Sequence, residues 1–338
     1  MNARQENILR EIVEFYIKTA KPVGSKSLCK KLGCSSATIR NEMASLEKLG
    51  YIEKNHISSG RIPSENGYKY YVANLMKPKE LSKGDAMKLQ TIFQNHELAL
   101  SDAIEACVEI ISEITSYTSV MLGKNSYSNF LQQVNIIPLS DQKIVAIVCT
   151  DKGVVENKQF TLPNSIKINE VVKASEIINK MLIGTPISKV SERLEYEIKP
   201  IIAEKIEAYE TIYSIFSKTF SDFQENSHKE TIRVKGREYL LSEPEYSDVN
   251  KIKTILEKFE DKSLISKIDN EKESGVKIYI GNDSDFDKDV TVIKTTYHLN
   301  GTEGTIAIVG PKRMEYDRVV GLLSFINQEL NEGDESGK

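Results

Sequence analysis

Cysteine and histidine are scarce in this chain of 338 residues. The four cysteines form no Cys-x-x-Cys pair and no regular framework, which indicates reduced structural thiols and predicts a cytoplasmic protein. They are Cys29, Cys34, Cys107 and Cys149. The four histidines lack the spacing of metal ligands, so the sequence predicts neither a metal site nor another cofactor.

Long apolar runs are also lacking. No window approaches the roughly 18 uninterrupted apolar residues of a transmembrane helix. The opening residues, MNARQENILRE, lack the apolar core of a signal peptide, so we expect no membrane partner. With 40% apolar and 28% charged residues, the composition is that of a globular protein, and the length predicts two or three domains.

Charge is distributed unevenly along the chain. The net charge of −4 argues against a nucleic-acid binder when it is taken as a whole. Residues 1–76, however, carry 12 Lys and Arg against 7 Asp and Glu, a net charge of +5, whereas the remainder carries 33 against 42, a net charge of −9. Because phosphate attraction depends on the local surface, a basic module attached to an acidic body remains compatible with DNA binding.

The N-terminal region predicts three helices. Apolar residues recur with a helical period, and serine or asparagine stands where each helix begins: Asn2 before the first, Ser25 at the second and Ser35 before the third. Glycines and a proline punctuate the segments between them. The predicted helices span residues 3–18, 25–32 and 36–49.

The third helix has one apolar and one polar face. Its core positions are Ile39, Met43 and Leu46. The opposite half is polar, short-chained and almost free of acids, and it carries Thr38, Asn41, Ser45 and Lys48. A helix that enters the major groove needs such a face, because acidic side chains would repel phosphates. With the turn at residues 32–35, the pattern predicts a helix-turn-helix with a recognition helix at 36–49.

A two-stranded wing is predicted directly after this helix. Residues 51–54 alternate like a strand, residues 58–60 are typical of a tight turn, and a return strand begins at Arg61 and ends at Pro63. Ser64 is expected to cap a fourth helix whose stripe is Tyr68, Tyr71, Val72 and Leu75.

The body of the chain alternates between helical and strand-like segments. A helix-rich stretch covers about 82–115, and a helical pattern returns at 166–226, 248–259 and 315–330. The predicted strands are 118–122, 131–138, 143–149, 154–162, 276–280, 290–296 and 304–309. A helical segment therefore stands between two strand-bearing halves, which predicts an α+β multidomain fold.

No motif of the body favours catalysis. The run from Asn282 to Asp289 has alternating aspartates, but Lys288 and Lys294 occupy the Gly and Glu positions of an EF-hand, so an acidic loop is predicted. Residues 301–304 lack the context of a nucleotide loop and predict a hairpin turn. An enzyme with an accessory DNA-binding domain would need convergent titratable residues, which the sequence does not offer.

The motifs taken together resemble the family of heat-inducible transcription repressors called HrcA. The resemblance runs from the first helices to the last strand, with mild departures at Ile57, Ser59 and Lys69. It is carried by Thr19, Pro22 to Ser25, Ser35 to Asn41, Leu46, Glu47, Gly50, Tyr51, His56, Ser58, Gly60 to Pro63, Gly67, Tyr68, Tyr71, Val72, Gly304, Ile306, Ile308, Gly310, Pro311, Met314 and Tyr316.

The resemblance implies a domain plan. It comprises a winged helix-turn-helix at 1–76, a linker and helix at 77–99, a GAF-like α/β domain at 100–160 and 231–332, and an inserted helix-rich dimerisation domain at 161–230. It also implies a non-enzymatic repressor that binds an inverted-repeat operator of chaperone operons as a homodimer. The chaperonin promotes its activity, and heat stress relieves repression.

The polar face and the wing supply the candidate DNA contacts. Asn41 and Thr38 are the expected base contacts, because Asn pairs with adenine and Thr touches a thymine methyl group. Arg40 is expected at phosphate or paired with a nearby glutamate, and His56 either contacts DNA or fixes the wing. The full predicted set is Ser36, Thr38, Arg40, Asn41, Ser45, Lys48, His56, Ser58 and Arg61.

A second interpretation keeps the role in transcription regulation but replaces heat with a small molecule as the signal. GAF-like domains often bind small ligands, so the body could make the chain a small-molecule-responsive regulator. A saturable thermal shift with a metabolite would favour that alternative.

Overall fold

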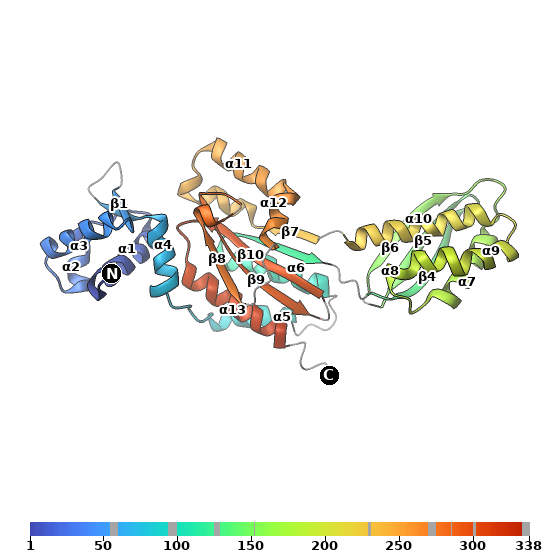
Figure 1. Ribbon diagram of the computed structural model, residues 1–338, viewed down its shortest axis with the longest axis horizontal. Helices are drawn as coiled ribbons and strands as arrows, with labels where there is room; N and C mark the ends of the chain where they lie inside the picture. The colour runs from blue at the N-terminus through green and yellow to red at the C-terminus, as the bar shows by residue number, and fades with distance from the viewer. Residues whose placement is uncertain are drawn as a thin grey trace. The chain divides into compact units, whose positions relative to one another are not determined.

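The structure is a computed structural model (Figure 1). It describes residues 1–54, 60–93, 100–124, 129–151, 153–228, 231–269, 275–284, 286–299 and 302–332. The chain forms two compact units. Unit 1 consists of Met1–Gly123 and Ile232–Lys338, and unit 2 consists of Lys124–Thr231.

Unit 1 begins with the predicted winged helix. Its elements are α1 (Ala3–Thr19), α2 (Ser25–Leu32), α3 (Ser36–Lys48), β1 (Ile52–Lys54), β2 (Arg61–Pro63), α4 (Glu65–Tyr70) and the π-helical turn η1 (Tyr71–Leu75). β1 and β2 pair antiparallel, with Ile52 opposite Pro63 and Lys54 opposite Arg61. The strands of the wing are therefore confirmed.

Local capping explains where these helices begin. Asn2 and Gln5 form a reciprocal capping box at α1, and the Ser35 side chain accepts a hydrogen bond from the Thr38 backbone at α3. Ser25 was predicted to stand where α2 begins and to cap it, and the cap prediction is wrong. Gly24 is its N-cap and supplies no side-chain bond, while the Ser25 hydroxyl lies 2.9 Å from that of Ser36.

The apolar stripes of the three helices converge on one core. Ile8, Ile12, Ile39 and Leu46 are completely buried, as the helical periodicity predicts. The chain also needs a glycine at Gly67, because a Cβ there would lie 2.0 Å from the carbonyl oxygen of Tyr51. α4 can therefore pass directly behind the wing.

The rest of unit 1 is built on a five-stranded sheet. The order is β7 (Thr231–Lys235), β3 (Thr118–Lys124), β10 (Thr302–Pro311), β9 (Val290–Leu299) and β8 (Val276–Ile280). β9 and β10 form an antiparallel hairpin that begins at the pair Leu299 and Thr302. The turn was predicted at residues 301–304, whereas Thr302 to Gly304 already belong to β10, and Gly301 lies outside the described residues.

Helices cover both faces of this sheet (Figure 1). Along β10, Ile306 and Ile308 pack with one helical layer, whereas Ala307 and Val309 pack with the other, as strand alternation requires. The first layer contains α5 (Lys83–Phe93), α6 (Leu100–Thr115) and α13 (Tyr316–Glu332). The second contains α11 (Val249–Glu260) and α12 (Lys262–Ser266).

Unit 2 is a separate α/β sandwich of two layers. Its sheet is the meander β4 (Leu131–Ser140), β5 (Lys143–Thr150) and β6 (Val155–Thr161), with β5 in the middle. One face packs on helical segments through a core that includes Ile144, Val148, Ile178 and Phe216. These segments are α7 (Ile168–Leu182), α8 (Ile187–Arg193), η2 (Leu194–Ile198), α9 (Lys199–Lys205) and α10 (Tyr209–His228).

The boundary of the inserted segment differs from the predicted one. We expected residues 100–160 in the GAF-like half and the insertion at 161–230, whereas unit 2 already begins at Lys124. The reason is that β4 to β6 bond to one another and share their core with the following helices. A strand pattern reveals a strand, but not the sheet to which it belongs.

The acidic segment after β8 is held by lysines. Asp283 pairs with Lys69, and Asp287 pairs with Lys258. Asp283 and Asp287 thus each have an ammonium partner, as acidic residues of a structural loop often do. Among the described residues, no helix is both long and apolar enough to cross a membrane.

Candidate nucleic-acid interface

The recognition helix α3 presents one continuous exposed stripe. Ile39, Met43 and Leu46 are buried, so the opposite side of the helix faces outward. The exposed residues along it are Ala37, Arg40, Asn41, Ala44 and Lys48. The amide of Asn41 thus lies between two alanines, whose small side chains allow close approach to a groove, and two cations lie on the same stripe. The alanines were missed, although their spacing from Asn41 gives a clear signal.

The hydroxyl residues predicted on α3 lie at the flanks of this stripe and already have partners. The Thr38 hydroxyl lies 2.9 Å from that of Ser35, and Ser36 is bonded to Ser25. The Ser45 hydroxyl donates to the backbone carbonyl of Asn41 at 3.2 Å. Ser36, Thr38 and Ser45 are only partly exposed, so Arg40, Asn41 and Lys48 are the more accessible of the residues predicted on α3.

Arg61 ties the wing to the recognition helix. Its Nε and Nη2 atoms lie 2.8 and 2.7 Å from one carboxylate oxygen of Glu47. Lys54 of β1 lies 3.8 Å from the other oxygen of the same carboxylate. Only 17% of the Arg61 side chain is exposed, so most of its surface is engaged with the protein. A phosphate that binds Arg61 would therefore have to compete with the carboxylate of Glu47 for its guanidinium group.

The same strand is fixed by backbone contacts. Val23 and Arg61 exchange two backbone hydrogen bonds of 2.8 and 2.9 Å, which adds the segment before α2 to the wing. A Cβ at Gly60 would lie 2.6 Å from the Cβ of Pro22, so the two segments approach closely. The predicted tip of the wing, including His56 and Ser58, lies outside the described residues.

A hollow of about 680 Å³ lies where these elements meet. Four of its residues are cationic and none is acidic, although Glu47 neutralises part of the charge from outside the lining. The lining residues are Gly24, Ser25, Lys26, Arg40, Met43, Lys54 and Arg61. The sequence alone did not indicate Lys26 and Lys54, because only the fold brings them beside Arg40. Such a concave cationic surface suits a phosphodiester backbone.

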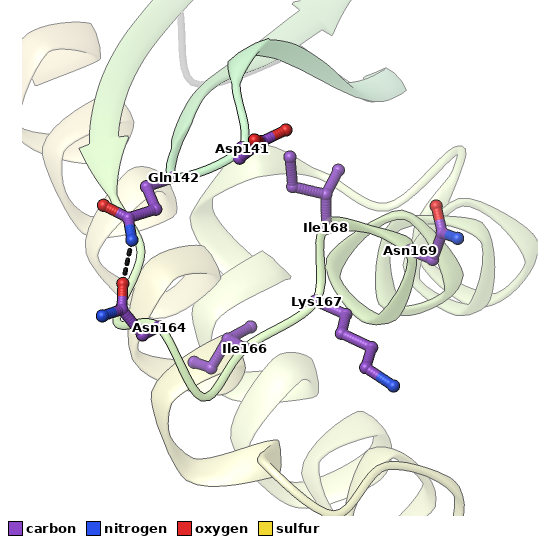
Figure 2. Close-up of a pocket in the computed structure, with 7 residues that line it drawn as sticks. All are labelled: Asp141, Gln142, Asn164, Ile166, Lys167, Ile168 and Asn169. Atoms are coloured by element: carbon purple, nitrogen blue, oxygen red, sulfur yellow. Dashed lines mark hydrogen bonds between the residues drawn. The ribbon is translucent and has the colours of Figure 1, made fainter.

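A second hollow, of about 530 Å³, lies in unit 2 (Figure 2). It is formed by the β4–β5 turn and the segment that leads into α7. The Gln142 amide donates to the side-chain oxygen of Asn164 at its edge, and Lys167 points away from it in the view. Its one carboxylate, Asp141, has no histidine, cysteine or second acid beside it in the lining. It therefore lacks the paired groups of a catalytic or metal site.

Comparison with known proteins identifies relatives over most of the chain. Residues 1–73 match the model described as the winged helix-turn-helix transcription repressor HrcA, DNA-binding, and residues 101–320 match that of the HrcA protein C-terminal domain. The chain is 36% identical over 333 residues to the heat-inducible transcription repressor HrcA of Bacillus pumilus (strain SAFR-032), covering 97% of this chain and 96% of that one.

Two further matches agree. The protein of the same name from Lysinibacillus sphaericus is 37% identical over 334 residues, covering 97% of this chain and 96% of that one. A crystal structure described as that of a hypothetical protein at 2.2 Å resolution covers 100% of both chains, with a TM-score of 0.68 and 24% identity. The overall architecture therefore recurs in a solved structure.

Proposed function

The chain belongs to the HrcA family of heat-inducible transcription repressors, and we propose that it represses chaperone operons by binding an inverted-repeat operator as a homodimer. The observation that carries the proposal is the exposed stripe of α3, with Asn41 between two alanines and flanked by cations. Base recognition falls to Asn41, with Thr38 at the edge of the stripe.

Phosphate contacts set the position of the helix in the groove. Arg40 and Lys48 are exposed on α3, and Lys26 and Lys54 line the adjoining hollow. Ammonium and guanidinium groups on a concave surface release counterions from DNA and supply affinity without sequence preference. Arg61 adds to the positive potential of this surface, although its ion pair with Glu47 offsets part of its charge. His56, Ser58, Ser36 and Ser45 complete the proposed contact set.

Unit 2 supplies the proposed dimer contact. The outer face of this sheet carries Ile137, because Ile144 and Val148 of β5 point to the core and Val145, which alternates with them, points away from it. Leu139 lies at the register irregularity between Pro138 and Ser140. Ile137 pairs with Val145 of β5, whose side chain lies on the same outer face. Ile137 and Leu139 are 46% and 55% exposed, respectively. We propose that a second copy of the chain covers this face, since a two-fold dimer matches a two-fold operator.

The heat response is assigned to the chaperonin. Its availability at normal temperature would promote the active form, and its engagement by unfolded proteins during heat stress would release the operons. The proposal follows from family membership and from the word heat-inducible in the names of the relatives. We place the repressor in the cytoplasm, together with its operator and the chaperonin.

A gel-shift titration tests operator binding. The probes are an inverted-repeat chaperone operator and a scrambled duplex at several salt concentrations, with and without chaperonin. We expect a preference for the operator of about 10³ or more and a further gain with chaperonin. Equal, salt-sensitive binding to both duplexes, even with chaperonin, would contradict a specific repressor.

The dimer contact has its own test. Ile137→Asp places a charge on the outer sheet face and should shift sedimentation toward the monomer, with loss of operator affinity and unchanged binding to a single half-site. Ile183→Asp is the matched control, because Ile183 is 50% exposed but follows α7 rather than lying on the sheet. A dimer that persists in Ile137→Asp would exclude this face.

A further inference from the structure

The winged-helix domain, residues 1–76, is fastened to the rest of unit 1 around a buried tyrosine pair. Tyr68 of α4 and Tyr316 of α13 have ring centroids 6.0 Å apart, and they are 4% and 0% exposed. The Tyr316 hydroxyl donates to the backbone carbonyl of Lys312 at 2.5 Å. Both rings belong to one continuous apolar core that includes residues of both domains. The contact is therefore packed like a protein interior.

Arg313, in the turn between β10 and α13, joins three segments. Its Nη1 atom donates to the backbone carbonyl of Ile17, in the last turn of α1, at 2.8 Å. Its Nε atom lies 2.6 Å from the carboxylate of Glu245, and its Nη2 atom lies 2.7 Å from that of Glu243. Only 14% of the Arg313 side chain is exposed, so these charge-assisted bonds are shielded from solvent.

Glu243, Glu245 and Arg313 affect one another's pKa values. Burial raises the pKa of Glu243 even though Arg313 opposes the shift, and the charge of Glu245 adds to the increase. Burial lowers the pKa of Arg313, but its hydrogen bond and charge interaction with Glu245 outweigh that effect and leave it raised. Without the guanidinium, two partly buried carboxylates would face each other and the Ile17 carbonyl would lose its donor.

A second polar cluster lies between α4 and the loop after β8. Glu65 accepts a hydrogen bond from the backbone N–H of Asn282 at 3.3 Å and lies 3.6 Å from the ammonium of Lys312. Lys69, one turn later on α4, lies 2.8 Å from the carboxylate of Asp283. The winged-helix domain is thus held at α4 as well as at α1.

The connecting segment is also held in place. The backbone N–H of Lys79 donates to the carbonyl of Asp317 at 2.9 Å. A Cβ at Gly321 would lie 1.9 Å from the carbonyl oxygen of Lys79, so the glycine lets the segment lie directly on α13. The link between the domains therefore runs along a helix instead of acting as a free tether.

We infer that Arg313 is a positioning residue that fixes the winged-helix domain on the body of unit 1 and thereby restricts the half-site spacings that a dimer can bind. The inference rests on the proposed dimeric binding of an operator. Two rigidly mounted recognition helices bind together only when the half-sites have the matching separation and helical phase, whereas tethered domains tolerate several spacings. Arg313 acts through the domain contact and not through DNA.

The test is a series of operators whose half-sites are moved apart in single base pairs. Wild-type protein should lose at least about tenfold in affinity when roughly half a helical turn is inserted. Arg313→Gln should lose less than about threefold over the same series, with half-site affinity within about twofold of wild type. Arg318→Gln is the matched control, because Arg318 lies on α13 and, in the part of the chain that the structure describes, forms an ion pair with its neighbour Glu315 on its own side of the domain contact.

Hydrogen exchange gives a readout that needs no DNA. In Arg313→Gln, peptides covering residues 77–81 and 280–284 should exchange faster, while those of α1 to α3 and of β9 and β10 keep their protection. If Arg313→Gln folds poorly, Glu245→Gln is the milder variant, because it leaves the bond to Glu243.

The outcomes are distinguishable. A wild type that does not prefer the operator over a scrambled duplex refutes the proposed function, and the exchange data then decide whether Arg313 holds the domains together. A wild type that prefers the operator but ignores spacing overturns the inference. So does an Arg313→Gln protein with the wild-type spacing profile, or one whose affinity falls equally on half-sites and on all operators.

Discussion

The carboxylate of Glu47 on the recognition helix accepts a hydrogen bond of 2.8 Å from Nε of Arg61 on the second wing strand and lies 2.7 Å from Nη2 of the same guanidinium. An ion pair therefore joins the two elements that would contact DNA. It is partly shielded from solvent, because the side chains of Arg61 and Glu47 are only 17% and 29% exposed. The pair orients the wing, and it also places one negative charge beside a cationic hollow.

Glu47→Gln should strengthen binding to all DNA sequences alike. The substitution removes the charge that holds Arg61, while the backbone bonds between Val23 and Arg61 keep the strand in place. A guanidinium freed for one more phosphate should steepen the dependence of log K on log salt by about 0.9. Filter binding to operator and random duplexes between low and moderate salt measures both effects.

The control for that substitution is Glu42→Gln, which removes the same charge from the same helix. Glu42 lies on the side of Arg4 and Gln5, away from the wing. Its removal should leave the salt slope nearly unchanged. Weaker binding of Glu47→Gln to every sequence would mean that orienting the wing matters more than releasing Arg61.

Asn41→Ala should relax sequence preference. An exposed amide on the recognition helix can form a two-point contact with adenine, so its loss should cost about 1–3 kcal/mol on the operator and little on random DNA. Competition binding with single-base operator variants locates the base. Lys48→Ala provides the contrast, because loss of a phosphate contact should weaken all sequences and lower the salt slope by about 1. Equal losses on both duplexes for Asn41→Ala would remove Asn41 from the base contacts.

Tyr68→Phe should leave the fold intact or stabilise it. The Tyr68 hydroxyl is buried without a hydrogen-bond partner among the described residues, and burial raises its pKa well above the ordinary value. Removing an unsatisfied buried hydroxyl removes its desolvation cost, so the free energy of unfolding should stay within about 0.5 kcal/mol or rise by about 1 kcal/mol. Tyr316→Phe should instead cost about 1 kcal/mol, because it loses a bond to a carbonyl. Urea unfolding of both variants decides the comparison.

The stabilising effect of Glu65 should disappear in acid. Burial raises the pKa of this carboxyl, but the hydrogen bonds from Lys69 and from the Asn282 backbone, with the charges of Lys69 and Lys312, outweigh burial and lower it. A carboxyl with a lowered folded-state pKa stabilises the fold above its unfolded pKa and loses that contribution as pH falls through the folded value. The difference in unfolding free energy between wild type and Glu65→Gln should therefore be largest at neutral pH and shrink below about pH 4.5.

The measurement is urea unfolding of both proteins from pH 7 to pH 3.5, with Glu53→Gln on the exposed side of β1 as the control. A difference that is the same at both ends of the range would mean that Glu65 contributes through packing and not through its charge.

The sequence by itself determined the local structure and the kind of protein. The capping pair Asn2 and Gln5, the Ser35 cap and the stripe of Ile39, Met43 and Leu46 fix helices through contacts within about one turn, and such contacts are readable from spacing. The same stripe leaves Asn41 and Lys48 on the outer side of α3. The family motifs of the winged helix lie in these local elements, which is why the recognition helix and wing could be predicted.

Only the tertiary structure decided which distant segments meet. The strands at 131–161 read correctly as strands, yet their assignment to unit 2 depends on a core shared with later helices. Glu47 meets Arg61 across 14 residues, and Arg313 meets the carbonyl of Ile17 across 296. Periodicity reports the face of an element but not its partner, because the partner is fixed by the path of the whole chain and by the burial that this path achieves.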